Sequence, residues 1–246
     1  MRQSTSHTPP PAGLHVGIIM DGNGRWATSQ GRSRSAGHRE GAVAVRRIVE
    51  AAPELGIGVL TLFAFSADNW RRPPAEVAWL MRLFREYLRA ETARCVANQV
   101  RLEIIGRRDR IGAVLREAAE AAERATAAGT RLHLRIALDY SARDAILRAA
   151  QCLRADTVPT REAFGRLLAI VDHGTPVPEV DLLIRTGGER RLSDFLLWEA
   201  AYAELVFTPV MWPEFGPDQL RDAVGEFAGR ERRFGTVIGT AARGAS

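Results

Sequence analysis

The chain has 246 residues, a mass of 27.0 kDa and a formal net charge of +5 at pH 7, and all 34 of its basic residues are Arg. The absence of Lys excludes a phosphate-binding loop that needs its Lys, a Schiff-base enzyme and a lysine general base, so any anion site must use guanidinium groups, backbone amides, hydroxyls and imidazoles. No apolar run approaches the roughly 20 residues that a membrane span needs.

Short apolar runs rich in β-branched residues alternate with longer helical patterns along the whole chain. The short runs predict strands at 15–20, 58–65, 101–106, 131–138, 181–186 and 204–207. The longer patterns predict helices at 37–52, 75–98, 109–127, 141–154 and 160–171. Together they predict an α/β fold, a single domain with a central, mostly parallel six-stranded sheet flanked by helices.

The two ends of the chain differ from this pattern. Residues 1–14 lack the apolar core of a secretory signal, so we expect a disordered N-terminal tail. We expect the folded domain to span 15–235 and a flexible C-terminal tail to span 236–246. Cys95 and Cys152 fall in expected helices without metal-ligand spacing, which predicts buried free thiols in a reducing cytoplasm.

The segment MDGNGRWA (20–27) directly follows the first expected strand. Gly22 and Gly24 flank Asn23 and permit close backbone approach, so free amides there could cradle a phosphate beside Arg25. Asp21, at the end of the strand, is well placed to hold a divalent metal. An ordinary pair of turns is the competing interpretation, because Asp-Gly and Asn-Gly usually mark turns.

Further basic residues lie in GRSRSAGHREG (31–41). Arg34 and His38 stand four residues apart, so on a helix they share one face and could clamp a diphosphate; a solvated basic face is the alternative. Between His15 and Arg47, six Arg and two acidic residues give a net charge of +4. Such a cluster around one Asp favours a polyanionic small molecule over a nucleic acid as the ligand.

Two later segments also place polar residues at the ends of expected strands, where open parallel sheets bind ligands. FAFSADNWRRP (63–73) carries Ser66 and Asn69, and LLIRTGGERRLSD (182–194) carries Arg185, Arg191 and Ser193 around a Gly-Gly turn. The latter set predicts a second anion site.

Glu204 is the only acid in AAYAELVF (200–207), and is either a surface residue or a metal ligand. The expected helix at 75–98 has a wide apolar face, which is typical of core packing but also suits the wall of an elongated apolar cavity. The pattern alone leaves both pairs of alternatives open.

Six segments together resemble the cis-prenyltransferase family, and most closely its bacterial undecaprenyl diphosphate synthases. They are HVGIIMDGNGRWA, GHREG, FAFSADNW, DLLIRTGGERRLSDFLLW, AYAEL and RERRFG, which keep the family's order and approximate spacing from about His15 to Gly235. The resemblance implies a cytoplasmic homodimer whose subunits each carry a hydrophobic tunnel, with RERRFG reaching towards the neighbouring subunit. It also allows peripheral membrane contact through the product.

The reaction that the resemblance implies is a Mg²⁺-dependent condensation of isopentenyl diphosphate with an allylic diphosphate, such as geranyl or farnesyl diphosphate, to give a cis-polyprenyl diphosphate. By match, Asp21 and Glu204 hold the metal, and Asp21, Ser66 and Asn69 are catalytic. The residues that match the allylic diphosphate site are Gly22, Asn23, Gly24, Arg25, Trp26, Arg34, His38 and Arg72. Those that match the isopentenyl diphosphate site are Arg185, Arg191 and Ser193.

The chain departs from the family pattern at three places. It reads DYSARDAI (139–146) where the family usually has NYGGR, so Asp139, Ser141 and Ala142 replace Asn and two Gly. Asp68 replaces the usual Glu of the SxENW motif. Trp79 stands where a small residue is expected, and a ring that points inward there would shorten the cavity and the product.

Three other functions compete with a long-chain synthase. A short-chain synthase is favoured if Trp79 blocks the cavity. A non-catalytic scaffold subunit is disfavoured by the presence of Asp21, Asn23, Arg25 and the RTGG segment. Nucleic-acid binding is suggested by the pI near 10.1 alone, and we expect no nucleic-acid partner because the charge is clustered.

Overall fold

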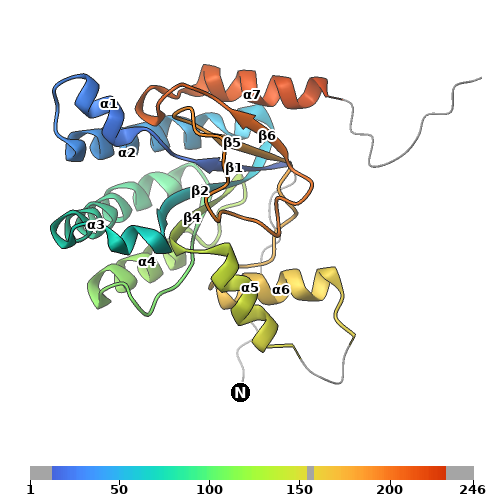
Figure 1. The fold of residues 1–246 in the computed structure, drawn as a ribbon. Coiled ribbons are helices and arrows are strands. Elements are labelled where there is room, and N and C mark those ends of the chain that lie inside the picture. Colours follow the sequence, from blue (N-terminus) through green and yellow to red (C-terminus); the bar gives the residue numbers. More distant parts are fainter. Residues whose placement is uncertain (1–12, 154–157, 231–246) are drawn as a thin grey trace, which may run out of the picture.

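The computed structural model describes residues 13–153 and 158–230, and within them it contains a six-stranded sheet with helices packed around it (Figure 1). The strands are β1 (Leu14–Ile19), β2 (Ile57–Ser66), β3 (Val100–Ile105), β4 (Leu132–Tyr140), β5 (Leu182–Arg185) and β6 (Glu204–Phe207). All six expected strands are confirmed, as is the single α/β domain.

Every pairing in the sheet is parallel, and the strand order is β3-β4-β2-β1-β5-β6. β1 is central, with β2 on one side and β5 on the other. The chain therefore leaves β1 in one direction across the sheet and later returns to its other side. Such a reversal of strand order opens a crevice at the carboxyl ends of the strands, which is where α/β proteins bind ligands.

The helices are α1 (Asn23–Ser29), α2 (Arg34–Ala51), α3 (Pro74–Ala97), α4 (Ala113–Thr126), α5 (Ala142–Gln151), α6 (Arg161–Val171) and α7 (Pro217–Gly229). Short 3₁₀ helices lie at η1 (Pro53–Leu55), η2 (Ala67–Arg71) and η3 (Trp212–Glu214). The five expected helices are confirmed with shifted ends, whereas α1 and α7 were not predicted. Only Leu220 and Ala223 of α7 are buried, although Val224 and Phe227 also pack against the core at helical spacing.

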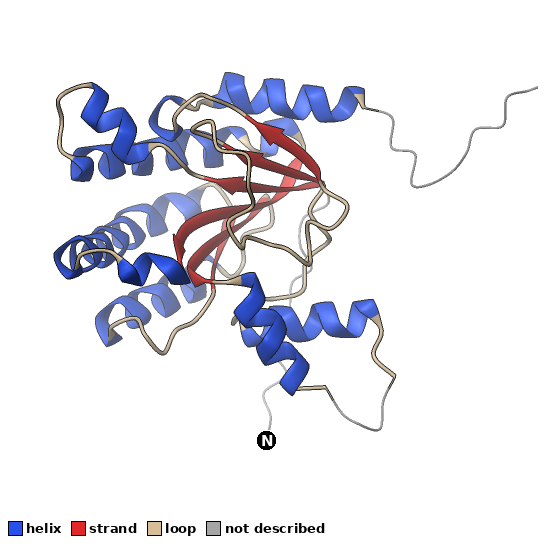
Figure 2. Cartoon of the chain, in the orientation of Figure 1, coloured by secondary structure: helices blue, strands red, loops and turns tan. Residues whose placement is uncertain are grey.

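Helices and loops lie on both sides of the sheet (Figure 2). The two faces of the sheet bury different sets of side chains. One face, with Val16, Ile18, Leu62 and Ile184 among its residues, belongs to the largest hydrophobic core together with residues of α2, α3, α4 and α7. The other face packs on the segment around Phe195, while α5 packs against α6 in a separate cluster. Functional side chains can therefore reach the carboxyl edge of the sheet from either face.

Three expectations about the chain's periphery are corrected or extended. Leu14, expected in the N-terminal tail, is the first residue of β1 and its amide donates to the carbonyl of Gly56 at 2.9 Å.

Cys95 is buried, and burial raises its pKa, but Cys152 is exposed rather than buried; neither forms a disulfide. Among the described residues, no helix combines the length and apolarity needed to cross a membrane. The expected C-terminal tail and most of RERRFG lie outside the described residues.

Candidate active site

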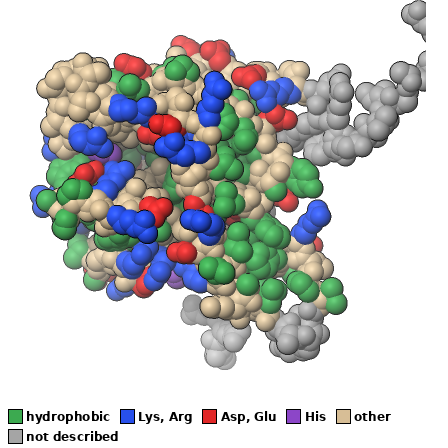
Figure 3. Space-filling model, in the orientation of Figure 1, with side chains coloured by type: hydrophobic (Ala, Val, Ile, Leu, Met, Phe, Trp, Pro, Cys, Tyr) green, Lys and Arg blue, Asp and Glu red, His purple; other side chains and the backbone are tan. Residues whose placement is uncertain are grey.

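A cavity of about 790 Å³ opens at the carboxyl end of the sheet, beside β1. Its mouth is polar and its inner part is apolar. Basic side chains, with acidic ones among them, gather on the left and centre of the face shown in Figure 3. Of the residues expected at the site, those that line the cavity are Asp21, Gly22, Asn23, Gly24, Arg34, His38, Ser66, Asn69, Arg72, Arg185, Arg191 and Ser193.

Asp21 lies at the point where the strand order reverses, two residues after β1. Its Oδ2 accepts a hydrogen bond from Nη2 of Arg185 at 2.9 Å, and its Oδ1 accepts one from the amide of Gly22 at 2.7 Å. Arg25 approaches the same Oδ1 at 3.3 Å. The Asp21 backbone is held by Thr186, whose hydroxyl accepts from the amide and donates to the carbonyl. The carboxylate is therefore fixed in direction.

Opposing effects set the protonation of Asp21. Burial favours the neutral acid, but the hydrogen bonds from Arg185 and Gly22 and the positive charges of Arg185 and Arg25 outweigh it, so the pKa of Asp21 lies below its usual value. The group is an anion at neutral pH, and its side chain is still 31% exposed towards the cavity. It can accept a further cation.

Close packing between α1 and α2 positions the next part of the site. A Cβ on Gly37 would stand 2.0 Å from the carbonyl oxygen of Asn23, and one on Gly41 would stand 2.2 Å from its Oδ1. Only Gly lets these helices approach so closely. Arg34 is brought in the same way, because its guanidinium lies directly over Gly24. The Oδ1 of Asn23 is buried and has no hydrogen-bond partner.

His38 faces the cavity from α2. Burial, together with the nearby charges of Arg72 and Arg34, lowers its pKa to about 4, although Glu76 opposes the shift. The ring is therefore neutral at pH 7, and its buried Nε2 has no partner. A neutral imidazole supplies a hydrogen bond to a ligand rather than a positive charge.

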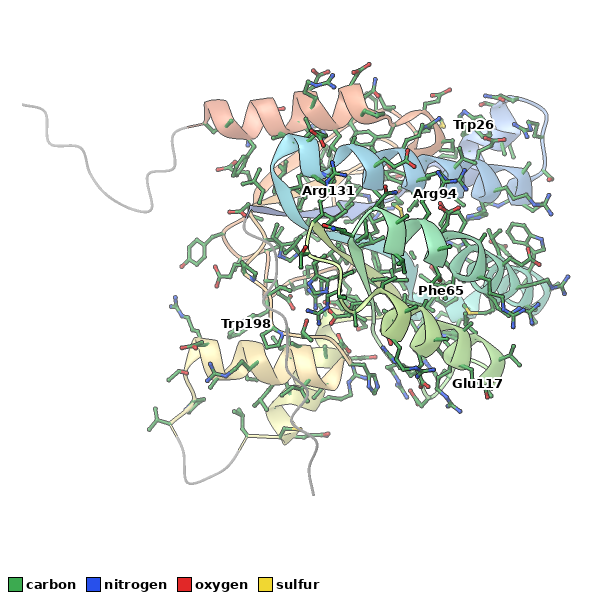
Figure 4. The ribbon with its side chains drawn as sticks, turned by 180° about the vertical axis from the view of Figure 1, so that it is seen from behind. Trp26, Phe65, Arg94, Glu117, Arg131 and Trp198 are labelled. Atoms are coloured by element: carbon green, nitrogen blue, oxygen red, sulfur yellow. The ribbon has the colours of Figure 1, made fainter. Side chains whose placement is uncertain are left out.

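The segment after β2 forms the opposite wall. Asn69 Oδ1 accepts from the amide of Ser66 at 3.1 Å, which closes the 3₁₀ turn η2. Arg72 donates a hydrogen bond to Glu76 of α3 at 3.0 Å, so its positive charge is paired with a carboxylate. Phe65, labelled in Figure 4, packs edge-on against Phe84 of α3 beneath this wall.

A second basic group lies beyond β5. Arg185 is almost wholly buried and donates from Nη1 to the carbonyl of Arg191 at 2.5 Å and to the hydroxyl of Ser193 at 2.7 Å. Ser193 and Asp194 both have positive φ, 49° and 64°. Asp194 holds this turn to α5 by accepting from Ser141 at 2.5 Å. Arg185 thus connects Asp21 with the second basic group.

The apolar part of the cavity lies between the sheet and helices α2 and α3. Its lining from α3 consists of Leu80, Leu83, Phe84, Tyr87 and Leu88. Core packing and cavity lining, the two interpretations of this apolar face, both apply. Val77, Leu80 and Cys95 are buried in the core, and the α3 residues that line the cavity belong to the same face. The Tyr87 hydroxyl donates to the carbonyl of Ala42 and ties α3 to α2 across the inner end.

Four residues stand outside the cavity lining. Trp79 does not line the cavity: its ring lies beside His38 and under the guanidinium of Arg39, so the condition under which it would shorten the cavity is not met. Trp26 donates to Glu214 at 3.0 Å on the outer side of α1 (Figure 4). Arg25 reaches Asp21 from the rim.

Glu204 is the fourth residue that lies outside the cavity lining. It begins β6 opposite Leu182, about 10 Å along the strands before the level of Arg185, which ends β5. Asp21 lies beyond that level, because it follows Ile19, the residue opposite Arg185. Glu204 pairs with Arg230 at 2.5 Å. Within one chain the expected pair of metal ligands is not brought together.

Three further residues of the site were not singled out from the sequence. Thr186 holds the backbone of Asp21, and Arg143 and Asp194 line the cavity. The sequence could have pointed to Asp194, which directly follows Ser193, and to Arg143, which lies in the segment that departs from the family pattern. No sequence feature pointed to Thr186, because its role depends on the pairing of β1 with β5.

Comparison with known proteins agrees with this geometry. Residues 19–235 match the family described as "Putative undecaprenyl diphosphate synthase". The chain is 62% identical to isoprenyl transferase 1 of Bradyrhizobium diazoefficiens over 90% of this chain and 89% of that protein. It is 49% identical to a farnesyl-diphosphate-specific ditrans,polycis-undecaprenyl-diphosphate synthase of Shewanella oneidensis, over 90% of this chain and 82% of that one.

Solved structures show the same fold. Lavandulyl diphosphate synthase of Lavandula x intermedia, crystallised with dimethylallyl diphosphate, superposes with a TM-score of 0.85 at 34% identity over 91% of this chain and 98% of that one. A probable undecaprenyl diphosphate synthase of Campylobacter jejuni gives 0.75 at 31% identity, with the same coverage. On sequence and structure together, the chain belongs to the cis-prenyltransferase family.

Proposed function

We propose that the protein condenses isopentenyl diphosphate with an allylic diphosphate, such as geranyl or farnesyl diphosphate, and produces a cis-polyprenyl diphosphate. One observation carries this proposal: two basic groups flank Asp21 at the mouth of a cavity whose inner part is apolar. Two diphosphates and one growing hydrocarbon chain need this combination of surfaces. The names of the relatives support the same chemistry.

The two substrates are assigned to the two sides of Asp21. The allylic diphosphate is assigned to the Gly22–Arg25 turn with Arg34, His38 and Arg72, and its hydrocarbon to the apolar space between α2 and α3. Isopentenyl diphosphate is assigned to Arg185, Arg191 and Ser193. Holding both substrates in one cavity makes their reaction effectively intramolecular, which lowers the entropic barrier.

The reaction breaks the carbon–oxygen bond of the allylic diphosphate, forms a carbon–carbon bond to isopentenyl diphosphate and releases a proton. Charge therefore accumulates on the departing diphosphate, and the fixed guanidinium groups around Asp21 are suited to stabilise it. Ser66 and Asn69, on the wall opposite Arg185, are assigned to the proton-loss step. The apolar walls exclude water from the allylic cation.

Mg²⁺ fits this site through Asp21 alone. The carboxylate is ionised and partly open to the cavity, and the described residues contain no group of three or more His, Cys, Asp or Glu that could hold a metal. A single carboxylate is enough for Mg²⁺, which usually keeps waters and shares substrate phosphates. When bound, the ion would supply Lewis-acid stabilisation of the leaving diphosphate. Trp26 and Glu204 have no assigned contact in this arrangement.

Three further parts of the proposal rest on the family resemblance: a homodimer, a cytoplasmic location with peripheral membrane contact through the product, and a tunnel long enough for that product. The test of the function is incorporation of radiolabelled isopentenyl diphosphate into butanol-extractable product with geranyl or farnesyl diphosphate, with and without Mg²⁺. Absence of product under every condition would contradict the proposal, and activity only with an added partner chain would favour a scaffold subunit.

A further inference from the structure

Asp139 is a buried carboxylate that the proposed function does not use. It lies near the carboxyl end of β4, its side chain is fully buried, and its φ is +54°. Among residues other than Gly, Asp and Asn adopt such left-handed backbone most readily. It replaces the Asn of the family pattern, so the chain adds a charge at this point. A buried charge is costly unless it is paired and hydrogen-bonded.

Two side chains satisfy this carboxylate. Trp70 donates from Nε1 to Oδ1 at 2.8 Å, and Arg110 donates from Nε to Oδ2 at 2.9 Å and from Nη2 to Oδ1. The guanidinium of Arg110 also lies over the Trp70 ring, 5.7 Å from its centroid. Asp139, Trp70 and Arg110 thus contact one another pairwise, and we call them the Asp139 clamp.

The clamp joins three segments that are distant in sequence. Trp70 belongs to η2, Arg110 to the loop before α4, and Asp139 to β4. The same loop is held by its backbone, because the amide of Arg107 donates to the carbonyl of Asp139 at 3.1 Å. The side chain and the main chain of one residue therefore fix the loop before α4.

The clamp is one residue away from the proposed reaction site. Trp70 follows Asn69, which lines the cavity and accepts from the amide of Ser66. Ser66 in turn pairs with Tyr140, the neighbour of Asp139 on β4. The 66–70 segment is thus tied to β4 at both ends, by a strand pairing at Ser66 and by the indole of Trp70. Without the indole bond, Trp70 would keep its ring contacts with Phe65 and Arg110 but would lose its hydrogen bond to β4.

We propose that Asp139 is a positioning residue, which holds Trp70 through its indole N–H and thereby fixes Asn69 in its place at the cavity wall. This inference rests on the proposed function, since it assigns a purpose to the placement of Asn69 in that reaction. It predicts that loosening the clamp lowers turnover more than it weakens binding of isopentenyl diphosphate. Among the described residues, no hydrogen bond or ion pair joins Arg185, Arg191 or Ser193 to the clamp.

The experiment compares three variants with the wild-type chain. Trp70→Phe removes the indole donor and keeps an aromatic ring against Phe65, which Trp70 meets edge-on at 5.4 Å. Asp139→Asn keeps an acceptor for Trp70 and the tolerance of positive φ but removes the charge beside Arg110. Asp109→Asn is the matched control, because Asp109 is an exposed carboxylate on the same loop that pairs with Arg107.

We expect Trp70→Phe to lower kcat about tenfold, since misplacing a group at a reaction site by a fraction of an ångström has effects of this order. The KM for isopentenyl diphosphate should stay within twofold. Asp139→Asn should lower kcat less than Trp70→Phe does, because it keeps an acceptor for the indole. Asp109→Asn should keep wild-type kcat. In ¹H–¹⁵N spectra, the indole signal that Trp70→Phe removes should shift in Asp139→Asn and stay in place in Asp109→Asn.

Each alternative outcome has a separate meaning. Unchanged kcat in Trp70→Phe, or equal losses in Asp139→Asn and Asp109→Asn, would overturn the positioning role while the wild type remains active. A large rise in KM for isopentenyl diphosphate with unchanged kcat would also overturn it. An inactive wild-type chain would instead contradict the proposed function, and the inference would fall with it. Thermal unfolding of each variant identifies any loss that reflects unfolded protein.

Discussion

Arg185 donates from Nη2 to Oδ2 of Asp21 at 2.9 Å, and from Nη1 to the carbonyl of Arg191 and the hydroxyl of Ser193. One buried guanidinium therefore spans the acid at the centre of the site and the second basic group. Because β1 and β5 are neighbours in parallel register, with Ile19 opposite Arg185, this contact follows from the strand order.

The first prediction concerns the charge of Asp21. Asp21→Asn keeps the size of the side chain but leaves Arg185 and Arg25 without their anion and removes the proposed Mg²⁺ ligand. We expect kcat/KM to fall at least about 100-fold, the order seen when a group that stabilises developing charge is lost. Incorporation of radiolabelled isopentenyl diphosphate measures it.

The control for this prediction is Asp218→Asn, which removes an exposed carboxylate of α7 that pairs with Arg221. It should retain wild-type activity. Comparable losses in both variants, or an Asp21→Asn protein with more than a tenth of the wild-type kcat/KM, would contradict a central role for Asp21.

A second prediction concerns the close approach of α1 and α2. A Cβ on Gly37 would stand 2.0 Å from the Asn23 carbonyl, whereas one on Gly225 in α7 would meet nothing within 4 Å. Gly37→Ala should lower the free energy of unfolding by about 1–3 kcal/mol, as overpacking does. Gly225→Ala should raise it by up to about 1 kcal/mol, because Ala favours the helix.

Urea unfolding followed by circular dichroism measures both changes. Gly37→Ala should also raise the KM for the allylic diphosphate, since Asn23 would have to move. Equal stability of the two variants would show that the helices can separate without cost.

Sequence patterns predicted the sheet well because its strands are buried on both faces and read as continuous apolar runs. They also located most of the cavity mouth, since Asp21, Ser66 and Arg185 each lie at or just beyond a strand end. What they could not supply was lateral order. Glu204 begins one predicted strand and Arg185 lies near the end of another, but only the strand order shows that these two strands are neighbours.

Side-chain direction was equally beyond the sequence. Trp79 and Tyr87 occupy the same amphipathic helix, and their spacing does not say which ring enters the cavity. The structure separates them, because Tyr87 bonds to Ala42 at the inner wall while Trp79 lies against Arg39. The clamp at Asp139 depends on a contact across 69 residues of sequence, which no local pattern records.

The third prediction concerns pH. The pKa of His38 is lowered to about 4 in the folded chain, chiefly by burial, from an ordinary value of about 6.5. The unfolded state therefore takes up a proton first as the pH falls. The stabilising contribution of neutral His38 is complete above pH 6.5 and is lost as the pH falls towards 4.

The test compares wild type with His38→Gln, because other buried His residues titrate in both proteins. Between pH 7 and pH 4 the wild type should lose more free energy of unfolding than the variant. An NMR titration of the His38 ring should show no midpoint between pH 8 and pH 5. A midpoint near pH 6.5, or parallel acid sensitivity of the two proteins, would contradict this assignment.

The last prediction concerns the inner end of the cavity. Tyr87 and Val45 line both the main cavity and a neighbouring one of about 230 Å³, so the Tyr87 ring stands between them. Tyr87→Ala should join the two spaces and lengthen the product by at least one isoprene unit. Each added methylene that enters an apolar space gains about 0.8 kcal/mol, so a longer chain would be retained there.

Mass spectrometry of the dephosphorylated products measures this change. Tyr87→Phe keeps the ring and should leave the length distribution unchanged, and so should Trp79→Ala, because Trp79 does not line the cavity. A longer product from Trp79→Ala, or an unchanged product from Tyr87→Ala, would show that the wall lies elsewhere. Because length is read from the product that forms, a loss of total activity in Tyr87→Ala does not obscure the result.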